Sequence, residues 1–240
     1  MRIGNGQHEL ELRAPGRLVL VLCLVCSLVG PRARAEGVHP ELGLAFSAFL
    51  SAGELAKLTR HGIGADGALH VVRIYRGFGL RGALGYQRLK GHDIPTGELF
   101  YPPAGPQEAV FKATQHFYWT AIGPEWRASV GSSHIDSYLM FGRADARADY
   151  SQAWLNTQGD FAPSSRTSLV VAGATWIPAD PPVEVGLEVL MGGSATFWAD
   201  PPVVVDGAGT HILRYSSASI SGVALRVGYR LWHPKQASDH

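Results

Sequence analysis

The clearest pattern in the chain is an alternation of apolar residues with small or charged ones from Ser217 to Trp232. An alternation of period two predicts a β-strand whose two faces meet different surroundings. From position 223 onward one face carries glycine, alanine, Arg226 and Arg230. The other face carries the apolar row Val223, Leu225, Val227, Tyr229 and Leu231. Large apolar groups opposite arginine and small residues suit a strand with lipid on one side and a narrow polar interior on the other.

The same alternation returns along residues 36–240 and predicts eight strands. In the stretch Pro40–Ser51 every second residue is apolar, and Phe49 is the one large residue on the opposite face. Val183–Trp198 alternates in the same way. No linker rich in proline or serine divides this part of the chain, so we expect a single domain. The predicted strands span residues 42–51, 68–76, 78–88, 111–129, 137–149, 167–177, 183–198 and 217–232.

The predicted connections between these strands alternate in length. Long loops are expected at residues 53–67, 90–107, 151–165 and 200–215, and short turns at 76–77, 130–136 and 178–182. This alternation is typical of an up-and-down antiparallel barrel that crosses a membrane, with short turns at one end and longer loops at the other. An even number of strands places both ends of the barrel segment on the same side of the membrane.

The position of the lysines bears on which strand face meets water. Lys57, Lys90, Lys112 and Lys235 lie in predicted loops, at the loop end of a strand or after the last strand. A strand face exposed to water normally carries lysine and glutamate, so their scarcity favours lipid outside and a cramped interior. Alternation alone does not say which way the apolar face points. A soluble periplasmic barrel or sandwich is therefore the alternative.

Residues 1–35 have the features of a secretory signal peptide. Arg17 precedes the apolar run Leu18–Val29, and Ala33 and Ala35 supply the small residues of a cleavage site. We therefore expect Glu36 to be the first residue of the exported chain. The apolar run is shorter than the roughly 20 residues that a helix needs to cross a bilayer, which disfavours a retained anchor.

Cysteine and charge content exclude some classes of function. Cys23 and Cys26 are the two cysteines of the chain and lie in the predicted signal peptide, so the exported part has no disulfide or thiolate chemistry. The whole chain has 21 basic and 20 acidic residues; five arginines and two glutamates fall within residues 1–35, which leaves 16 and 18. This near-neutral balance gives no electrostatic reason to expect nucleic acid as a partner.

The last two predicted strands carry opposite charges on their interior rows. Glu184 and Glu188 lie on one, and Arg226 and Arg230 lie on the other. In an antiparallel strand pair, the residue numbers of directly opposite residues add up to a constant. A sum of 414 sets Glu184 opposite Arg230 and Glu188 opposite Arg226. We predict that these pairs fill the interior, extended by Arg81 and Glu125. The residues that we predict to face lipid are Leu187, Val189, Leu225, Val227 and Tyr229.

Candidate catalytic groups are few. A serine hydrolase needs a histidine within hydrogen-bond reach of a serine. Ser132, Ser133 and His134 form the one close cluster of this kind, and it falls in a predicted short turn, where a polar turn is the better interpretation. The sequence therefore predicts no catalytic residue, no cofactor and no metal site.

On the architecture of residues 42–232 and the pattern of its last strand, the chain resembles the small eight-stranded outer-membrane β-barrel proteins of the OmpA/OmpX type. The resemblance implies an all-β, antiparallel up-and-down transmembrane barrel in a Gram-negative outer membrane, with both termini in the periplasm. It implies outer-membrane lipid, lipopolysaccharide and the barrel-assembly machinery as partners. The expected role is structural or in surface interaction, because side chains fill so narrow a barrel.

Two other roles are open for a barrel of this size. One is a narrow pathway for small apolar compounds, as in OmpW-like barrels. The other is a lipid-modifying enzyme in the membrane, since small barrels similar to this one include lipid A deacylases and acyltransferases.

Overall fold

The structure is a computed structural model that describes residues 39–75, 77–91, 94–96, 109–152, 164–205 and 211–232. The chain divides into two compact units, Met1–Val38 and His39–His240, and every described element belongs to the second. The predicted signal peptide lies outside the described residues.

Among the described residues, no helix combines the length and the apolar character needed to cross a membrane.

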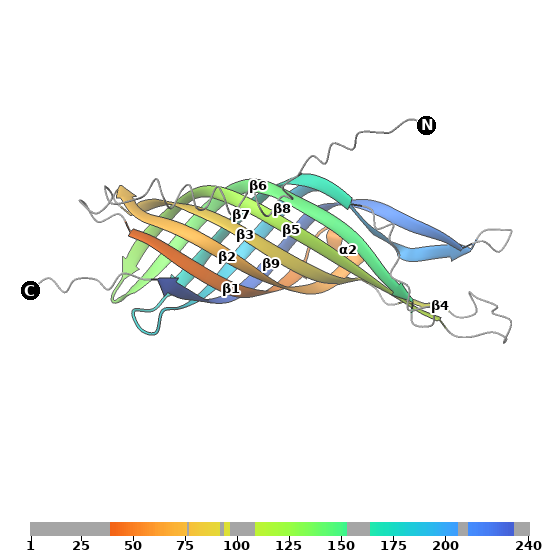
Figure 1. The fold of residues 1–240 in the computed structure, drawn as a ribbon, viewed down its shortest axis with the longest axis horizontal. Coiled ribbons are helices and arrows are strands. Elements are labelled where there is room, and N and C mark those ends of the chain that lie inside the picture. Colours follow the sequence, from red (N-terminus) through yellow and green to blue (C-terminus); the bar gives the residue numbers. More distant parts are fainter. Residues whose placement is uncertain are drawn as a thin grey trace, which may run out of the picture. The chain divides into compact units, whose positions relative to one another are not determined.

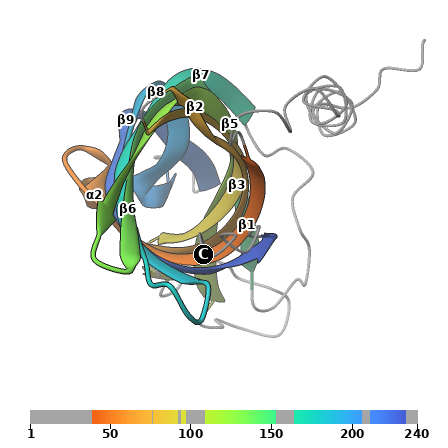
Figure 2. The ribbon, with the colours of Figure 1, turned by 90° about the vertical axis from the view of Figure 1, so that its left-hand side faces the viewer.

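Antiparallel strands form nearly all of the described structure, and one short helix interrupts them (Figure 1). Strand β1 pairs with both β2 and β9, and β3 pairs with β5, so the sheet closes on itself (Figure 2). The three-residue strand β4 pairs with the start of β5 and takes no part in the closure. The elements are β1 (His39–Ser51), α2 (Leu55–Leu58), β2 (Thr59–Tyr75), β3 (Phe78–Gly91), β4 (Ile94–Thr96), β5 (Ala109–Val130), β6 (Ser133–Gln152), β7 (Ser164–Ile177), β8 (Val183–Val205) and β9 (His211–Trp232).

The closed sheet confirms the predicted eight-stranded antiparallel up-and-down barrel, because β1, β2, β3 and β5 to β9 each pair with the strand before and after. In the closed part of the sheet each strand has a partner on both sides. Toward the loop end, the described parts of β8 after Gly192 and of β9 before Ser221 pair with each other and have no second strand partner. The alternation that predicted the strands has a simple physical cause. Successive side chains of a strand point to opposite faces, so one set faces out and the other fills the barrel.

The two ends of the barrel differ in their connections. We call one end the turn end, because β2–β3, β5–β6 and β7–β8 are joined there across residues 76–77, 131–132 and 178–182. Gly77 and Gly131 have φ angles of 87° and 62°, a backbone conformation that favours glycine in tight turns. We call the opposite end, which carries α2 and β4, the loop end (Figure 1).

Strand β2 differs most from its prediction. It begins at Thr59, whereas the sequence suggests a loop over residues 53–67 and a strand from 68. The glycines of this stretch favoured a loop, but they are small residues that the pairing with β3 requires. A Cβ atom at Gly64 would overlap the Gln87 side chain and the Tyr86 carbonyl, and one at Gly62 would overlap Leu89. The connection between β1 and β2 is therefore residues 52–58, which include the helix α2.

Other strands also run further than alternation alone indicated. Strand β8 continues to Val205 and β9 begins at His211, so most of the predicted loop at 200–215 belongs to a strand pair. Strand β6 begins at Ser133, which shortens the predicted turn at 130–136. The apolar alternation is interrupted in these extensions, for example by Asp200, Pro201 and Pro202, so alternation alone did not assign them to strands.

Candidate functional site

The exterior of the barrel carries large apolar side chains on all eight barrel strands. The residues predicted to face lipid all lie on this surface: Leu187, Val189, Leu225, Val227 and Tyr229 are 57, 40, 51, 50 and 46% exposed. Other exposed apolar side chains are Leu44, Phe46, Leu50, Ile63, Ile74, Phe78, Leu80, Leu84, Ile122, Leu139 and Phe141. An apolar surface that surrounds a molecule of this size is far larger than a soluble monomer exposes.

Aromatic residues mark the turn end of this apolar surface. Trp126 lies near the end of β5, Trp176 near the end of β7 and Tyr229 near the end of β9, and all three are exposed. Tryptophan and tyrosine gather where a bilayer meets water, because their rings are apolar and carry one polar group.

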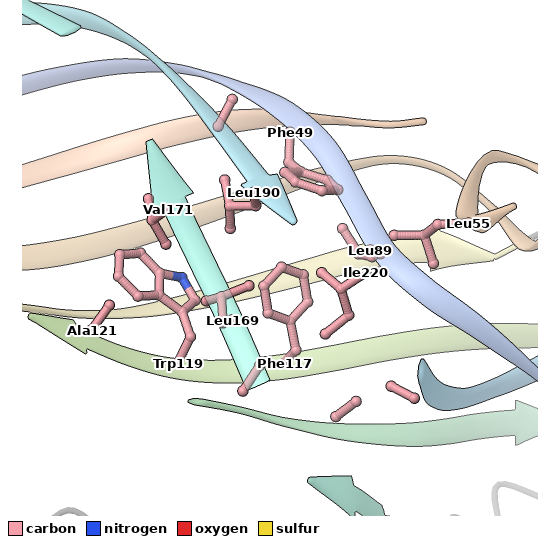
Figure 3. Close-up of a cluster of buried hydrophobic side chains, with 14 of the residues drawn as sticks. Phe49, Leu55, Leu89, Phe117, Trp119, Ala121, Leu169, Val171, Leu190 and Ile220 are labelled. Atoms are coloured by element: carbon pink, nitrogen blue, oxygen red, sulfur yellow. The ribbon is translucent and has the colours of Figure 1, made fainter. Parts of the chain in front are cut away.

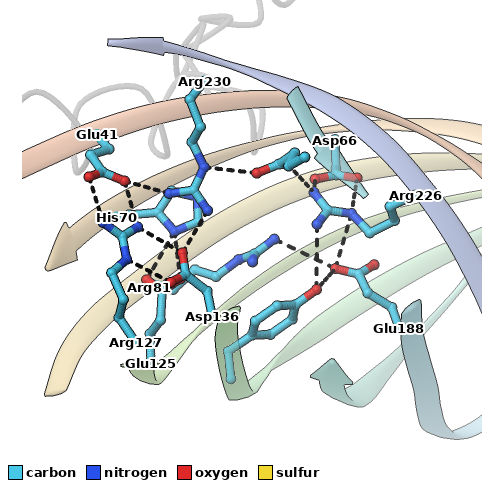
Figure 4. Close-up of polar contacts among 12 residues, drawn as sticks. Glu41, Asp66, His70, Arg81, Glu125, Arg127, Asp136, Glu188, Arg226 and Arg230 are labelled. Atoms are coloured by element: carbon cyan, nitrogen blue, oxygen red, sulfur yellow. Dashed lines mark hydrogen bonds and ion pairs between the residues drawn. The ribbon is translucent and has the colours of Figure 1, made fainter. Parts of the chain in front are cut away.

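The interior at the turn end holds a cluster of buried charged residues, which we call the charged network (Figure 4). Its members come from β1, β2, β3, β5, β6, β8 and β9, so the network crosses the barrel in several directions. The members are Glu41, Asp66, His70, Arg81, Glu125, Arg127, Asp136, Glu184, Glu188, Arg226 and Arg230.

Arg127 and Arg230 together hold two carboxylates close to the turn end. Arg127 donates to both oxygens of Glu41, at 2.7 Å each, and to both oxygens of Asp136, at 2.7 and 2.8 Å. Arg230 donates to Glu41 at 2.6 Å and to Asp136 at 2.9 Å, and its Nε donates to Glu184 at 2.8 Å. Bidentate pairs of this kind are strong and directional. They tie β1, β5, β6, β8 and β9 together across the interior.

Arg226 forms a second centre one layer further from the turn end. It donates to both carboxylate oxygens of Asp66, and its Nε lies 3.2 Å from Glu188. The Tyr138 hydroxyl donates to Glu188 at 2.7 Å. The Arg81 guanidinium lies 3.7 Å from the centre of the Tyr138 ring and 3.6 Å from Glu188. Arg226, Asp66 and Glu188 lie away from water and pair with one another, whereas the buried Arg81 nitrogens have no hydrogen-bond partner among the described residues.

The predicted register of β8 and β9 is wrong, although the ion pairs that motivated it are present. The residue numbers of opposite residues add up to 412 rather than 414, so Glu184 lies opposite Gly228 and Glu188 lies opposite Ala224. Each arginine side chain reaches a glutamate that lies two residues away from the position directly opposite the arginine on the partner strand. The long arginine side chain makes this possible, and Gly228 leaves the space: a Cβ there would lie 2.8 Å from Glu184 Oε1.

His70, Glu125 and Asp136 offer ligand atoms that all lie within 4.8 Å of one another, the one group of this kind found among the described residues. His70 Nδ1 lies 2.8 and 2.9 Å from the two oxygens of Glu125. Asp136, however, already accepts hydrogen bonds from Arg127 and Arg230 through both oxygens. Neighbouring guanidinium groups repel a cation, so we assign the three residues to the charged network rather than to a metal site.

The interior toward the loop end is filled by apolar side chains, which we call the apolar plug (Figure 3). Phe49 and Phe117 meet edge to face, with ring centres 5.8 Å apart. Leu55 of α2 is fully buried in the same cluster, so the first connection covers part of it. Phe49, the large residue that broke the small-residue face in the sequence, is thus a central part of the plug. Further members are Leu89, Trp119, Leu169, Val171, Leu190 and Ile220.

The serine and histidine cluster does not form a catalytic arrangement in the structure. His134 lies in β6 close to the turn end, and its Nδ1 is 3.4 Å from Ser129 Oγ at an exposed position. Ser132 is exposed in the turn. A nucleophile needs a base that is oriented by a third group in a protected site, and an exposed turn does not provide one.

Sequence reasoning missed five members of the charged network: Glu41, Asp66, His70, Arg127 and Asp136. Asp66 and Asp136 fell in predicted connections, and His70 lay in a strand with weak alternation. The other two had a usable signal. Glu41 continues the interior row of β1 that contains Gly43 and Ala45, and Arg127 follows Glu125 on the interior row of β5.

An apolar exterior, an aromatic border and a charged interior in a closed sheet of eight strands define the architecture of a small transmembrane β-barrel. No known protein family matches the sequence. No curated protein sequence matches it either.

Three solved structures similar to this chain are outer-membrane or surface proteins. Ail of Yersinia pestis, in complex with the heparin analogue sucrose octasulfate, is 12% identical over 80% of this chain and 97% of its own, with a TM-score of 0.48. Neisserial surface protein A is 12% identical over 81% of this chain and 99% of its own, with a TM-score of 0.42. A major outer membrane protein from Thermus thermophilus is 12% identical over 80% of this chain and 99% of its own, with a TM-score of 0.42. At this level of similarity no residue role passes from them to this chain.

Proposed function

We propose that this chain is an outer-membrane protein with a structural or surface-interaction role, and that its interior conducts neither ions nor solutes. The observation that carries the proposal is the filling of the barrel. The charged network occupies the interior at the turn end, and the apolar plug occupies it toward the loop end. A barrel of eight strands is just wide enough for side chains to fill it.

In this proposal the turn end faces the periplasm and the loop end faces outward, because short turns are periplasmic in barrels of this kind. Export would remove residues 1–35 and leave Glu36 first. The barrel-assembly machinery would then insert the chain among outer-membrane lipid and lipopolysaccharide.

Three alternatives are less well supported. A soluble periplasmic barrel would hide side chains such as Phe46, which is 77% exposed. An OmpW-like pathway for small apolar compounds would need open space where Phe117 and Leu190 are fully buried. A lipid-modifying enzyme would need a protected catalytic group beside the acyl chains, and His134 lies at the turn end.

Refolding into vesicles of neutral phosphatidylcholine tests the proposal. We expect an unboiled sample to migrate differently from a boiled one on a gel, and planar bilayers containing the protein to show no single-channel current. The Leu187→Arg and Leu225→Arg double variant is the control for insertion and should remain outside the vesicles. Wild-type protein that stays in solution with one mobility would contradict the membrane location, and a steady current would contradict the filled interior.

A further inference from the structure

The exterior at the loop end carries a group of cationic side chains on neighbouring strands, which we call the basic arc. It comprises Arg88 and Lys90 on β3, Arg143 and Arg147 on β6, and Arg166 on β7, all of them exposed. Among the side chains that the structure describes, no exposed arginine or lysine lies at the turn end. The exposed arginines and lysines of the described exterior therefore gather toward the loop end.

On β3 and β6 the basic arc follows the apolar outward row of the same strand. On β3 the outward row passes from Leu80 and Leu84 through Tyr86 to Arg88. On β6 it passes from Phe141 to Arg143. A lipid molecule that lies against these apolar side chains would hold its head group at the level of the cations.

Strand pairing places the cations side by side around the barrel. Arg88 is opposite His116 on β5, and His116 is opposite Arg147 on β6. Arg166 is opposite Asp145 on the next pair of strands. Since adjacent strands lie about 4.8 Å apart, Arg88 and Arg147 are roughly 10 Å apart along the circumference.

Acidic neighbours neutralise only part of this charge. Arg147 Nε lies 2.9 Å from Asp149 and Arg166 Nε lies 2.6 Å from Asp145, yet these arginine side chains are 57 and 63% exposed. Arg88 and Arg143 pair with no carboxylate in the part of the chain that the structure describes. At the loop end of β9, on the other side of the barrel, Ser217 and Ser219 are exposed and carry no charge, and Arg214 is an exposed cation outside the arc.

We propose that the basic arc binds the phosphate groups of phosphorylated lipids in the outer leaflet, and so holds a layer of such lipid against β3, β5, β6 and β7. Guanidinium groups match phosphate through paired hydrogen bonds, which explains why arginine predominates in the arc. The inference rests on the proposed function, because it requires the loop end to lie in the outer leaflet.

Protein purified in a zwitterionic detergent is titrated with diphosphoryl lipid A, with the same lipid after removal of its phosphates, and with inorganic phosphate. The readout is bound lipid by native mass spectrometry, together with the temperature at which the folded gel mobility is lost. We expect diphosphoryl lipid A to bind and to raise that temperature, and the other two probes to have little effect. Each cation removed should weaken binding by about fivefold, since a basic side chain near an anionic surface contributes on that scale.

The test variant replaces Arg88, Arg143, Arg147 and Arg166 with Gln, and the smaller variant Arg88→Gln/Arg143→Gln leaves both ion pairs of the arc intact. The matched control is Arg214→Gln, which removes an exposed arginine at the loop end of β9. The two-residue variant should weaken lipid A binding by about 25-fold and the four-residue variant by about 600-fold, whereas the control should bind as the wild-type protein does.

Equal binding of the dephosphorylated lipid, equal protection by inorganic phosphate, or the same loss in Arg214→Gln would overturn the inference. If the four-residue variant does not fold, lipid A binding by the two-residue variant tests the inference. Failure of the wild-type protein to enter neutral vesicles would instead contradict the proposed function. Because those vesicles contain no anionic lipid, that result does not depend on the basic arc.

Discussion

Replacing Arg226 with methionine tests whether the charged network stabilises the barrel. Methionine keeps an unbranched side chain but neither donates hydrogen bonds nor carries charge. The change removes both bonds to Asp66, the 3.2 Å contact with Glu188 and the 3.5 Å contact with Glu184, and leaves these carboxylates 1% exposed. Removing one partner of a buried ion pair costs about 3–5 kcal/mol, so we expect the free energy of unfolding to fall by that amount.

The matching change Glu188→Gln should cost less, about 1–3 kcal/mol, since Arg226 keeps Asp66 and the Tyr138 hydroxyl can donate to the amide oxygen. The double variant should lose less than the sum of the two, by about 0.5–3 kcal/mol. Urea unfolding in lipid vesicles, followed by tryptophan fluorescence and gel mobility, measures all four proteins of the cycle. The control Val227→Ala, which faces outward beside Arg226, should add to Glu188→Gln without coupling. Strictly additive losses for Arg226 and Glu188, or wild-type stability of Arg226→Met, would refute the reasoning.

Three further outcomes are expected. Leu225→Arg should lower the free energy of unfolding by about 2–4 kcal/mol if the site is near the bilayer midplane, and a spin label at this position should meet lipid-soluble quenchers; stronger quenching by water-soluble reagents would rule out a lipid-facing row. Phe117→Ala should cost about 3–5 kcal/mol through the cavity that it leaves, yet show no current in planar bilayers because the charged network still closes the turn end; a current would mean that the plug alone blocks the barrel. Mass spectrometry of the exported protein should find Glu36 as the first residue, and a retained Cys23 would contradict the cleavage site.

The barrel was predictable because its two faces differ so strongly along most of each strand. In β8 and β9 large apolar residues alternate with glycine, alanine and charge, and this pattern is seen without any knowledge of pairing. The start of β2 was not predictable in the same way. Gly62 and Gly64 are typical of a loop when they are considered alone, and their role becomes visible only when the side chains of Leu89 and Gln87 occupy the space beside them.

The charged network was predictable in kind but not in membership. Opposite charges on the interior rows of β8 and β9 indicated ion pairs, but the register depends on the whole ladder of backbone hydrogen bonds and on close contacts such as that at Gly228. A side chain as long as arginine pairs along a diagonal as readily as straight across. Contacts such as Arg127 with Glu41 join strands that are not neighbours, and no rule based on one strand pair identifies them.

The hydrogen bond between Arg230 and Glu41 joins residues 189 positions apart, across the seam where β1 meets β9. Until that seam closes, β1 and β9 both present open edges that can pair with another chain, and Glu41 lacks one of its two arginines. Closure brings together segments that are distant in sequence, which makes it entropically costly and slow. The chain therefore gains little from folding strand by strand during synthesis. It would need protection from self-association until β9 is available, and the final step would close the sheet and complete the charge pairing at the same time.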